Sequence, residues 1–158
     1  MDVMDYINKG GEIVYILLAL NIIGFTLIIW KFLTISNKKA MTNKILNKLD
    51  LSNTASLNTQ IEYEVKKLES GLTFIKNIAS SSPLLGLLGT VYGVLKSFEA
   101  ITSNGMGDPT IFSHGISVAL ITTMAGLIVA IPHHLCYNYF IHVLDELELK
   151  IKKEAAKI

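Results

Sequence analysis

The side chains that could do chemistry in the most apolar parts of this chain are hydroxyls rather than acids. Segments 79–98 and 111–140 contain no aspartate or glutamate, the groups that usually carry protons through a membrane. Their hydroxyl residues include Ser80, Ser81, Ser82, Thr90, Ser97, Ser117, Thr122 and Thr123. A hydroxyl donates and accepts hydrogen bonds but does not titrate near neutral pH. If protons move along these segments, we therefore expect another subunit to supply the acid.

Small residues surround two of these threonines at helical spacing. In the later segment four residues follow at steps of four, three and four and so share one narrow face: Ala119, Thr123, Gly126 and Ala130. In the earlier segment three residues share a face that begins near Pro83: Gly86, Thr90 and Ser97. Two such faces would suit a corridor that admits another helix, so one interpretation is that these residues line a pore. The alternative is helix packing by small residues, with the threonines hydrogen-bonded to their own backbone.

The earlier segment also repeats glycine at three- and four-residue spacing. Gly86, Gly89 and Gly93 stand among leucines, and no charge precedes Lys96 in this segment. Glycines at this spacing allow two helix backbones to approach closely in lipid. We expect Gly89 and Gly93 to serve helix packing rather than to line the pore.

One cluster of metal-ligand residue types lies near the end of the later segment, at His133, His134, Cys136 and His142. The cluster contains no acidic ligand, and we expect histidines packed at a membrane boundary rather than a metal site; a pH-sensitive contact is the other alternative. We find no glycine-rich phosphate loop and no local Ser/His/Asp arrangement. The sequence therefore predicts a protein that is not an enzyme and has no metal or cofactor.

Three apolar stretches are long enough to cross a bilayer, which needs about 20 residues. The composition agrees, with 51% hydrophobic residues and 17% charged residues and a mean hydropathy of +0.46. Residues 13–30 carry no charge, and 109–144 contain no Asp, Glu or Lys over 36 residues. We predict an all-α, polytopic membrane helix bundle whose long second and third helices extend into the cytoplasm.

The distribution of lysines predicts the orientation, because the chain has 14 lysines and no arginine. Eight lysines lie in 31–78 and four follow residue 140, whereas 1–12 and 96–110 hold one each. The positive-inside rule places the lysine-rich sides in the cytoplasm. The predicted order is a periplasmic N-terminus (1–12), a first span (13–30), a cytoplasmic helical segment (31–78), a second span (79–98), a periplasmic loop (99–110), a third span (111–140) and a cytoplasmic C-terminal helix (141–158). Acidic residues near Met1 favour an uncleaved first span over a signal peptide.

The segment between the first two spans has two helical patterns separated by a polar stretch. Apolar residues at four-residue steps predict a short helix at Met41, Ile45 and Leu49. Leu51–Gln60 is rich in Ser, Thr and Asn and predicts a loop. A second apolar stripe runs toward the second span through Ile61, Val65, Leu68, Leu72 and Ile75. Gly71 would weaken this helix without ending it. A similar stripe predicts that the third span continues as a helix into the tail.

The two later spans resemble the MotA/TolQ/ExbB proton-channel family, most closely its ExbB and TolQ members. The resemblance covers about 79–140 and rests on the run from Pro83 to Gly93, on 115–120 and on the positions that follow to Asn138: Thr123, Gly126-Leu127, Ala130-Ile131-Pro132 and Tyr137-Asn138. This chain differs from the family pattern at Val118, where relatives usually have glutamate, and at His133-His134, where they usually have small apolar residues. A relay through a glutamate at position 118 is therefore absent here.

The resemblance implies a homopentamer, a ring in the bacterial inner membrane around the single membrane helices of an ExbD-like dimer. Each of these helices would carry an aspartate, and proton flow past it would drive a TonB-like protein. The pore threonines of the family correspond to Thr90 and Thr123. Two alternatives remain, a TolQ-like subunit that energises envelope constriction and a membrane scaffold that conducts no protons. No nucleic-acid partner is expected.

Overall fold

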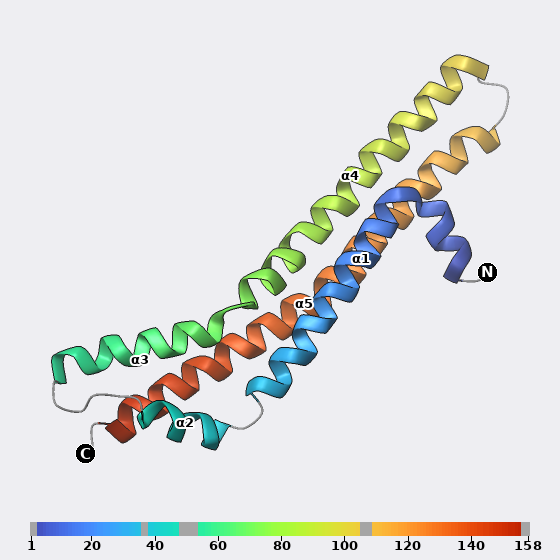
Figure 1. The fold of residues 1–158 in the computed structure, drawn as a ribbon. Helices are drawn as coiled ribbons and strands as arrows, with labels where there is room; N and C mark the ends of the chain where they lie inside the picture. Colours follow the sequence, from blue (N-terminus) through green and yellow to red (C-terminus); the bar gives the residue numbers. More distant parts are fainter. Residues whose placement is uncertain (1–2, 36–37, 48–53, 105–108, 156–158) are drawn as a thin grey trace.

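The computed structural model describes residues 3–35, 38–47, 54–104 and 109–155, and the regular structure in these ranges is entirely helical (Figure 1). In chain order the helices are α1 (Val3–Ile35), α2 (Lys38–Leu46), α3 (Thr54–Glu69), α4 (Leu72–Asn104) and α5 (Pro109–Ala155). Three of them, α1, α4 and α5, are long and apolar enough to cross a membrane. This finding confirms the prediction of an all-helical chain with three apolar spans.

The apolar helices α4 and α5 form an antiparallel pair, and α1 lies along it (Figure 1). Large apolar side chains on the outside of the pair are exposed, among them Leu84, Leu120 and Ile128. In a membrane these side chains face lipid, so their exposure carries no cost in burial. The side chains between the two helices are small, and they determine the geometry of the site described below.

The other end of the bundle has a buried apolar core. Here α3, the first turn of α4 and the last turns of α5 bury an apolar cluster whose most enclosed members are Ile61, Leu72, Ile75, Leu144 and Ile151. An α-helix of 47 residues is about 70 Å long, more than twice the roughly 30 Å hydrocarbon thickness of a bilayer. The continuation of the third span into the tail is therefore confirmed as one helix, with Lys152 paired to Glu148 at 2.6 Å.

The loop predicted over Leu51–Gln60 is wrong from Thr54 onward, because α3 begins there. Leu57 is buried and stands four residues before Ile61, so it extends the apolar stripe by one more turn. Polar composition was outweighed here by tertiary packing, which supplies most helix stability in proteins. Residues 51–53 and Leu49 lie outside the described residues.

Gly71 ends a helix instead of merely weakening it, which corrects the prediction of one helix through this position. Its φ of 88° is open to glycine at little steric cost, and it separates α3 from α4. Lys31 of α1 is 4% exposed, and its Nζ donates a hydrogen bond to the Ser70 carbonyl oxygen at 2.5 Å. A buried lysine from the first span thus caps a carbonyl that the helix end would leave without a donor.

The first span also differs from the stretch 13–30, because α1 begins ten residues earlier and bends. Gly11 has φ 67° and ψ −157°, a combination that is essentially confined to glycine. The bend turns residues 3–10, called the N-terminal arm below, away from the axis of α1 (Figure 1). At the same end of the bundle, α4 reaches Asn104 and α5 starts at Pro109; the residues between them, part of the predicted loop 99–110, lie outside the described ranges.

Candidate functional site

Thr90 of α4 and Thr123 of α5 meet across the helix pair. Their Oγ1 atoms are 2.5 Å apart, within hydrogen-bond distance. The Thr90 hydroxyl also lies 3.3 Å from the carbonyl oxygen of Gly86 and 3.4 Å from that of Ala119. The Thr123 hydroxyl reaches the same Gly86 oxygen at 3.4 Å. Both residues are only partly buried, so part of each threonine side chain is exposed at the edge of the helix pair.

The pair can form because glycines bring the two backbones together. A methyl group on Gly86 would lie 2.9 Å from the Thr122 carbonyl oxygen, and one on Gly126 would lie 2.6 Å from the Ser82 carbonyl oxygen. Such spacing excludes any side chain larger than hydrogen. Gly86 and Gly126 therefore place the threonine hydroxyls within reach of each other.

The remaining glycines continue the same close approach along α4. A methyl group on Gly93 would lie 2.6 Å from the Gly115 carbonyl oxygen, and one on Gly89 would overlap the side chain of Thr122. The α4–α5 contact thus runs as a seam of small residues, the arrangement that lets membrane helices associate through close packing.

Two threonine hydroxyls have two protons and four lone pairs to share. One proton occupies the bond between them, and the other can reach a carbonyl oxygen of Gly86 or Ala119. At least three lone pairs remain available to an outside donor. The second hydroxyl can also rotate from its carbonyl toward an outside acceptor. The pair can therefore hydrogen-bond a carboxylic acid in its protonated form and in its ionised form.

The other residues predicted to line a pore lie in or beside the same seam. Ala119 and Ala130 are 3% and 6% exposed, Gly86 and Gly126 are buried, and Pro83 is half-buried. In one chain these residues are covered mainly by the facing helix. Pore lining stays a prediction, because a single chain encloses no pore.

Three further hydroxyls in the apolar segments are satisfied by their own helices. Ser82 donates to the Ile78 carbonyl oxygen at 2.7 Å, and Thr122 donates to the Ala119 carbonyl oxygen at 2.9 Å. Ser97 donates to the Gly93 carbonyl oxygen at 3.1 Å and also lies 3.3 Å from the Phe112 carbonyl oxygen of α5. All three side chains are at most 1% exposed. The structure thus separates these three buried residues from the partly buried pair of Thr90 and Thr123, a difference that spacing alone does not reveal.

The histidines and the cysteine do not assemble into one site. Within the described ranges, no three His, Cys, Asp or Glu side chains come together as metal ligands would. His133 is fully buried, His134 and His142 are exposed, and Cys136 is half-buried. The exposed His142 ring lies 3.5 Å from a carboxylate oxygen of Glu146.

His133 packs instead between α5 and α1. Its Nδ1 lies 2.7 Å from the Val129 carbonyl oxygen, so the neutral ring carries its proton on Nδ1. The ring fills the space beside Gly24, where a methyl group would overlap Nε2, and it meets Phe25 edge-on at 5.1 Å. A glycine inside an otherwise bulky span was the available signal for this contact, and sequence reasoning did not use it.

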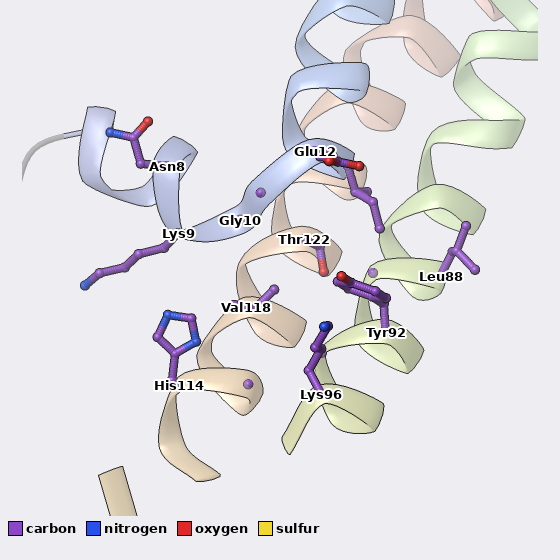
Figure 2. Close-up of a pocket in the computed structure, with 15 residues that line it drawn as sticks. Asn8, Lys9, Gly10, Glu12, Leu88, Tyr92, Lys96, His114, Val118 and Thr122 are labelled. Carbon is purple, nitrogen blue, oxygen red and sulfur yellow. The ribbon is translucent and has the colours of Figure 1, made fainter. Parts of the chain in front are cut away.

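Sequence reasoning also missed a cavity of about 610 Å³ between α1, α4 and α5. Figure 2 shows the N-terminal arm on one side of this cavity and α4 and α5 on the other. Its polar and apolar lining includes Lys9, Glu12, Tyr92, Lys96, His114 and Val118. The cavity depends on the bend at Gly11, which no apolar periodicity predicts.

The chain is similar in sequence to known membrane proteins of one family. Residues 33–153 match the model of the MotA/TolQ/ExbB proton channel family. The Tol-Pal system protein TolQ of Pseudomonas aeruginosa is 38% identical over 85 residues, which cover 54% of this chain and 37% of that protein. The biopolymer transport protein ExbB of Aquifex aeolicus is 40% identical over 81 residues, 51% of this chain and 55% of that protein. The TolQ protein of Haemophilus influenzae is 36% identical over 83 residues, 52% of this chain and 36% of that protein. The matched part of the chain thus spans between about a third and about a half of the length of these relatives.

Proposed function

This chain belongs to the MotA/TolQ/ExbB proton channel family, and on that premise we propose that it is an ExbB-like proton-channel subunit of the bacterial inner membrane. With an ExbD-like partner it converts the proton motive force into mechanical work, which a TonB-like protein delivers to outer-membrane uptake. A TolQ-like role in envelope constriction is the second candidate, because proteins named TolQ match the chain at a similar identity. In either role the protein is a channel subunit and not an enzyme.

The observation that carries this proposal is the hydrogen-bonded, partly buried pair of Thr90 and Thr123. The apolar parts of α4 and α5 contain no carboxylate, and their partly exposed hydroxyl pair can bond an acid in both protonation states. A single-span partner that carries an aspartate supplies the group that titrates. The protonated carboxyl donates to a threonine oxygen, and after the proton leaves, the carboxylate accepts from the same hydroxyls. The threonines thus hold the acid in place while its charge changes.

The rest of the architecture follows from the need to surround that acid. Five copies of the chain form a ring, with the α4–α5 seams turned toward the partner helices. A seam whose glycines leave no free space is rigid, so that the ring acts as the stationary part. One charge that crosses 100 mV releases about 2.3 kcal/mol, enough to bias a conformational equilibrium of a few kcal/mol.

The orientation in the membrane follows from charge. Twelve of the 14 lysines lie in 31–78 or after residue 140, so that α2, α3 and the end of α5 lie in the cytoplasm. The N-terminal arm and the α4–α5 turn then face the periplasm. This orientation can be tested by changing Asn8 and Ser103 to cysteine, one at a time, and adding a thiol reagent that does not cross the membrane. If neither cysteine is labelled from the periplasmic side, the proposed orientation is wrong.

Valine replacements test the channel proposal, because valine keeps the shape of threonine without the hydroxyl. In cells that lack the chromosomal copy, Thr90→Val and Thr123→Val should each lower energised uptake about 10- to 100-fold, the loss expected for one hydrogen bond to a charged group. Thr122→Val is the matched control, because its hydroxyl bonds only within α5. Thr90→Ser and Thr123→Ser should restore most of the activity.

Native mass spectrometry of the purified complex separates loss of activity from loss of assembly. We expect five copies of the chain with the partner in both valine variants. A double valine variant that assembles and supports uptake at the wild-type rate would show a scaffold that conducts no protons. Deletion of the gene distinguishes the two channel roles, since an ExbB-like subunit is needed for uptake and a TolQ-like subunit for envelope integrity.

A further inference from the structure

The cavity of about 610 Å³ beside the bend of α1 has a mixed lining that the channel proposal does not use. Lys9 on the N-terminal arm, Lys96 on α4 and His114 on α5 all line the cavity, and Figure 2 shows the Lys9 side chain turned away from Lys96. Glu12 lies at the bend, close to Gly11. Two lysines against one glutamate give the lining a net charge of +1 when His114 is neutral.

Part of the wall is apolar. Ile13, Leu88 and Val118 come from the three different helices and border the charged side chains. Leu88 is 56% exposed and Tyr92 is 51% exposed, so this side of the cavity opens toward the surface that lipid covers. A ligand with both an anionic and a hydrocarbon part matches this lining better than a small soluble anion does.

The lysines stand where a membrane places lipid phosphates. Lys9 precedes the uncharged stretch 13–30, and Lys96 is the first charge after Lys76 along α4. Both therefore mark the same boundary of the apolar layer, where long basic side chains reach phosphate groups. Lys96 contacts its neighbours weakly, since its ion pair with Glu99 has a 3.7 Å separation and both side chains are more than half exposed.

From these observations we propose that the cavity binds the headgroup of an anionic phospholipid. Its phosphate pairs with Lys96, Lys9 adds positive charge to the lining, and its acyl chain runs along Leu88. The net charge of the lining favours a headgroup of charge −1, such as phosphatidylglycerol. A zwitterionic headgroup would be neutral overall, and Glu12 would have to bind its ammonium group. This proposal needs only that the helices span a membrane, and it holds or fails independently of proton conduction.

Lipid titration of the delipidated, full-length complex tests the site. Native mass spectrometry measures how much phosphatidylglycerol each chain retains, compared with phosphatidylethanolamine and phosphatidylcholine. We expect phosphatidylglycerol to bind most tightly. The Lys9→Gln/Lys96→Gln double variant should bind it about 30-fold more weakly, with each lysine accounting for about fivefold.

The matched control is the Lys66→Gln/Lys153→Gln variant, which loses the same charge at exposed positions away from the cavity. It should retain phosphatidylglycerol as the wild type does. Equal affinity of both double variants, or equal retention of phosphatidylethanolamine, would overturn the proposal. Inorganic phosphate alone should not stabilise the complex against heat; if it matches the effect of phosphatidylglycerol, the site binds a soluble anion and the lipid assignment is wrong.

Discussion

The seam between α4 and α5 can be tested by placing one methyl group in it, with Gly86→Ala. The new Cβ would lie 2.9 Å from the Thr122 carbonyl oxygen, 3.1 Å from the Thr123 Cα and 3.4 Å from the Gly126 Cα. All three atoms belong to the backbone of α5, so no flexible side chain can move aside. The two helices must separate instead.

The separation can be worked out from these contacts. Unstrained carbon contacts lie at about 3.5 Å or more, so the helices move apart by about 0.5 Å. The bond between the Thr90 and Thr123 hydroxyls, now 2.5 Å, lengthens to about 3.0 Å and survives. The contacts of both hydroxyls with carbonyls across the seam, now 3.4 Å, lengthen to about 3.9 Å and are lost. Overpacking of this kind costs about 1–3 kcal/mol.

Thermal unfolding of the purified complex measures that cost. For a chain of this size the melting temperature should fall by about 2–12 °C. Gly126→Ala should cause a larger fall, because its methyl group would lie 2.6 Å from the Ser82 carbonyl oxygen. Leu87→Ala is the control, since Leu87 is 58% exposed on the outside of the pair. If Gly86→Ala and Leu87→Ala melt at the same temperature, the seam is not close-packed and the argument for a rigid ring fails.

Two further substitutions test how α1 is held at its ends. Gly11→Ala adds a methyl group that meets nothing within 4 Å, so its cost of about 1–3 kcal/mol comes only from the strained backbone conformation. Amide hydrogen exchange in residues 3–10 should become faster. Unchanged exchange protection would show that the bend needs no glycine. Lys31→Met removes the donor to the Ser70 carbonyl and should destabilise the bundle by about 1–3 kcal/mol. Thermal unfolding measures this loss, and the exposed Lys66→Met variant should melt like the wild type; equal melting of the two variants would contradict a capping role for Lys31.

Residue spacing predicted which residues form the candidate site but not how they contact one another. The positions of Thr90 and Thr123 among small residues were enough to single them out, because helical periodicity places such residues on one face. Spacing could not show that the two hydroxyls meet, nor that Ser97, on the predicted face of Thr90, is buried and bonded to backbone carbonyls of α4 and α5. That difference depends on how far α4 is rotated against α5, which is fixed by the contacts of Gly86 and Gly126 rather than by either helix alone.

The sequence by itself determined that the chain is a three-span helical membrane protein, because uncharged stretches of this length have few stable states outside a bilayer. It also determined that the spans lack an acid of their own. Only the tertiary structure decided the register of the α4–α5 seam, the burial of His133 against Gly24, the helix break at Gly71 and the cavity beside Gly11. These features arise from contacts between residues far apart in the chain and from single glycine conformations. Neither leaves a periodic pattern in the sequence.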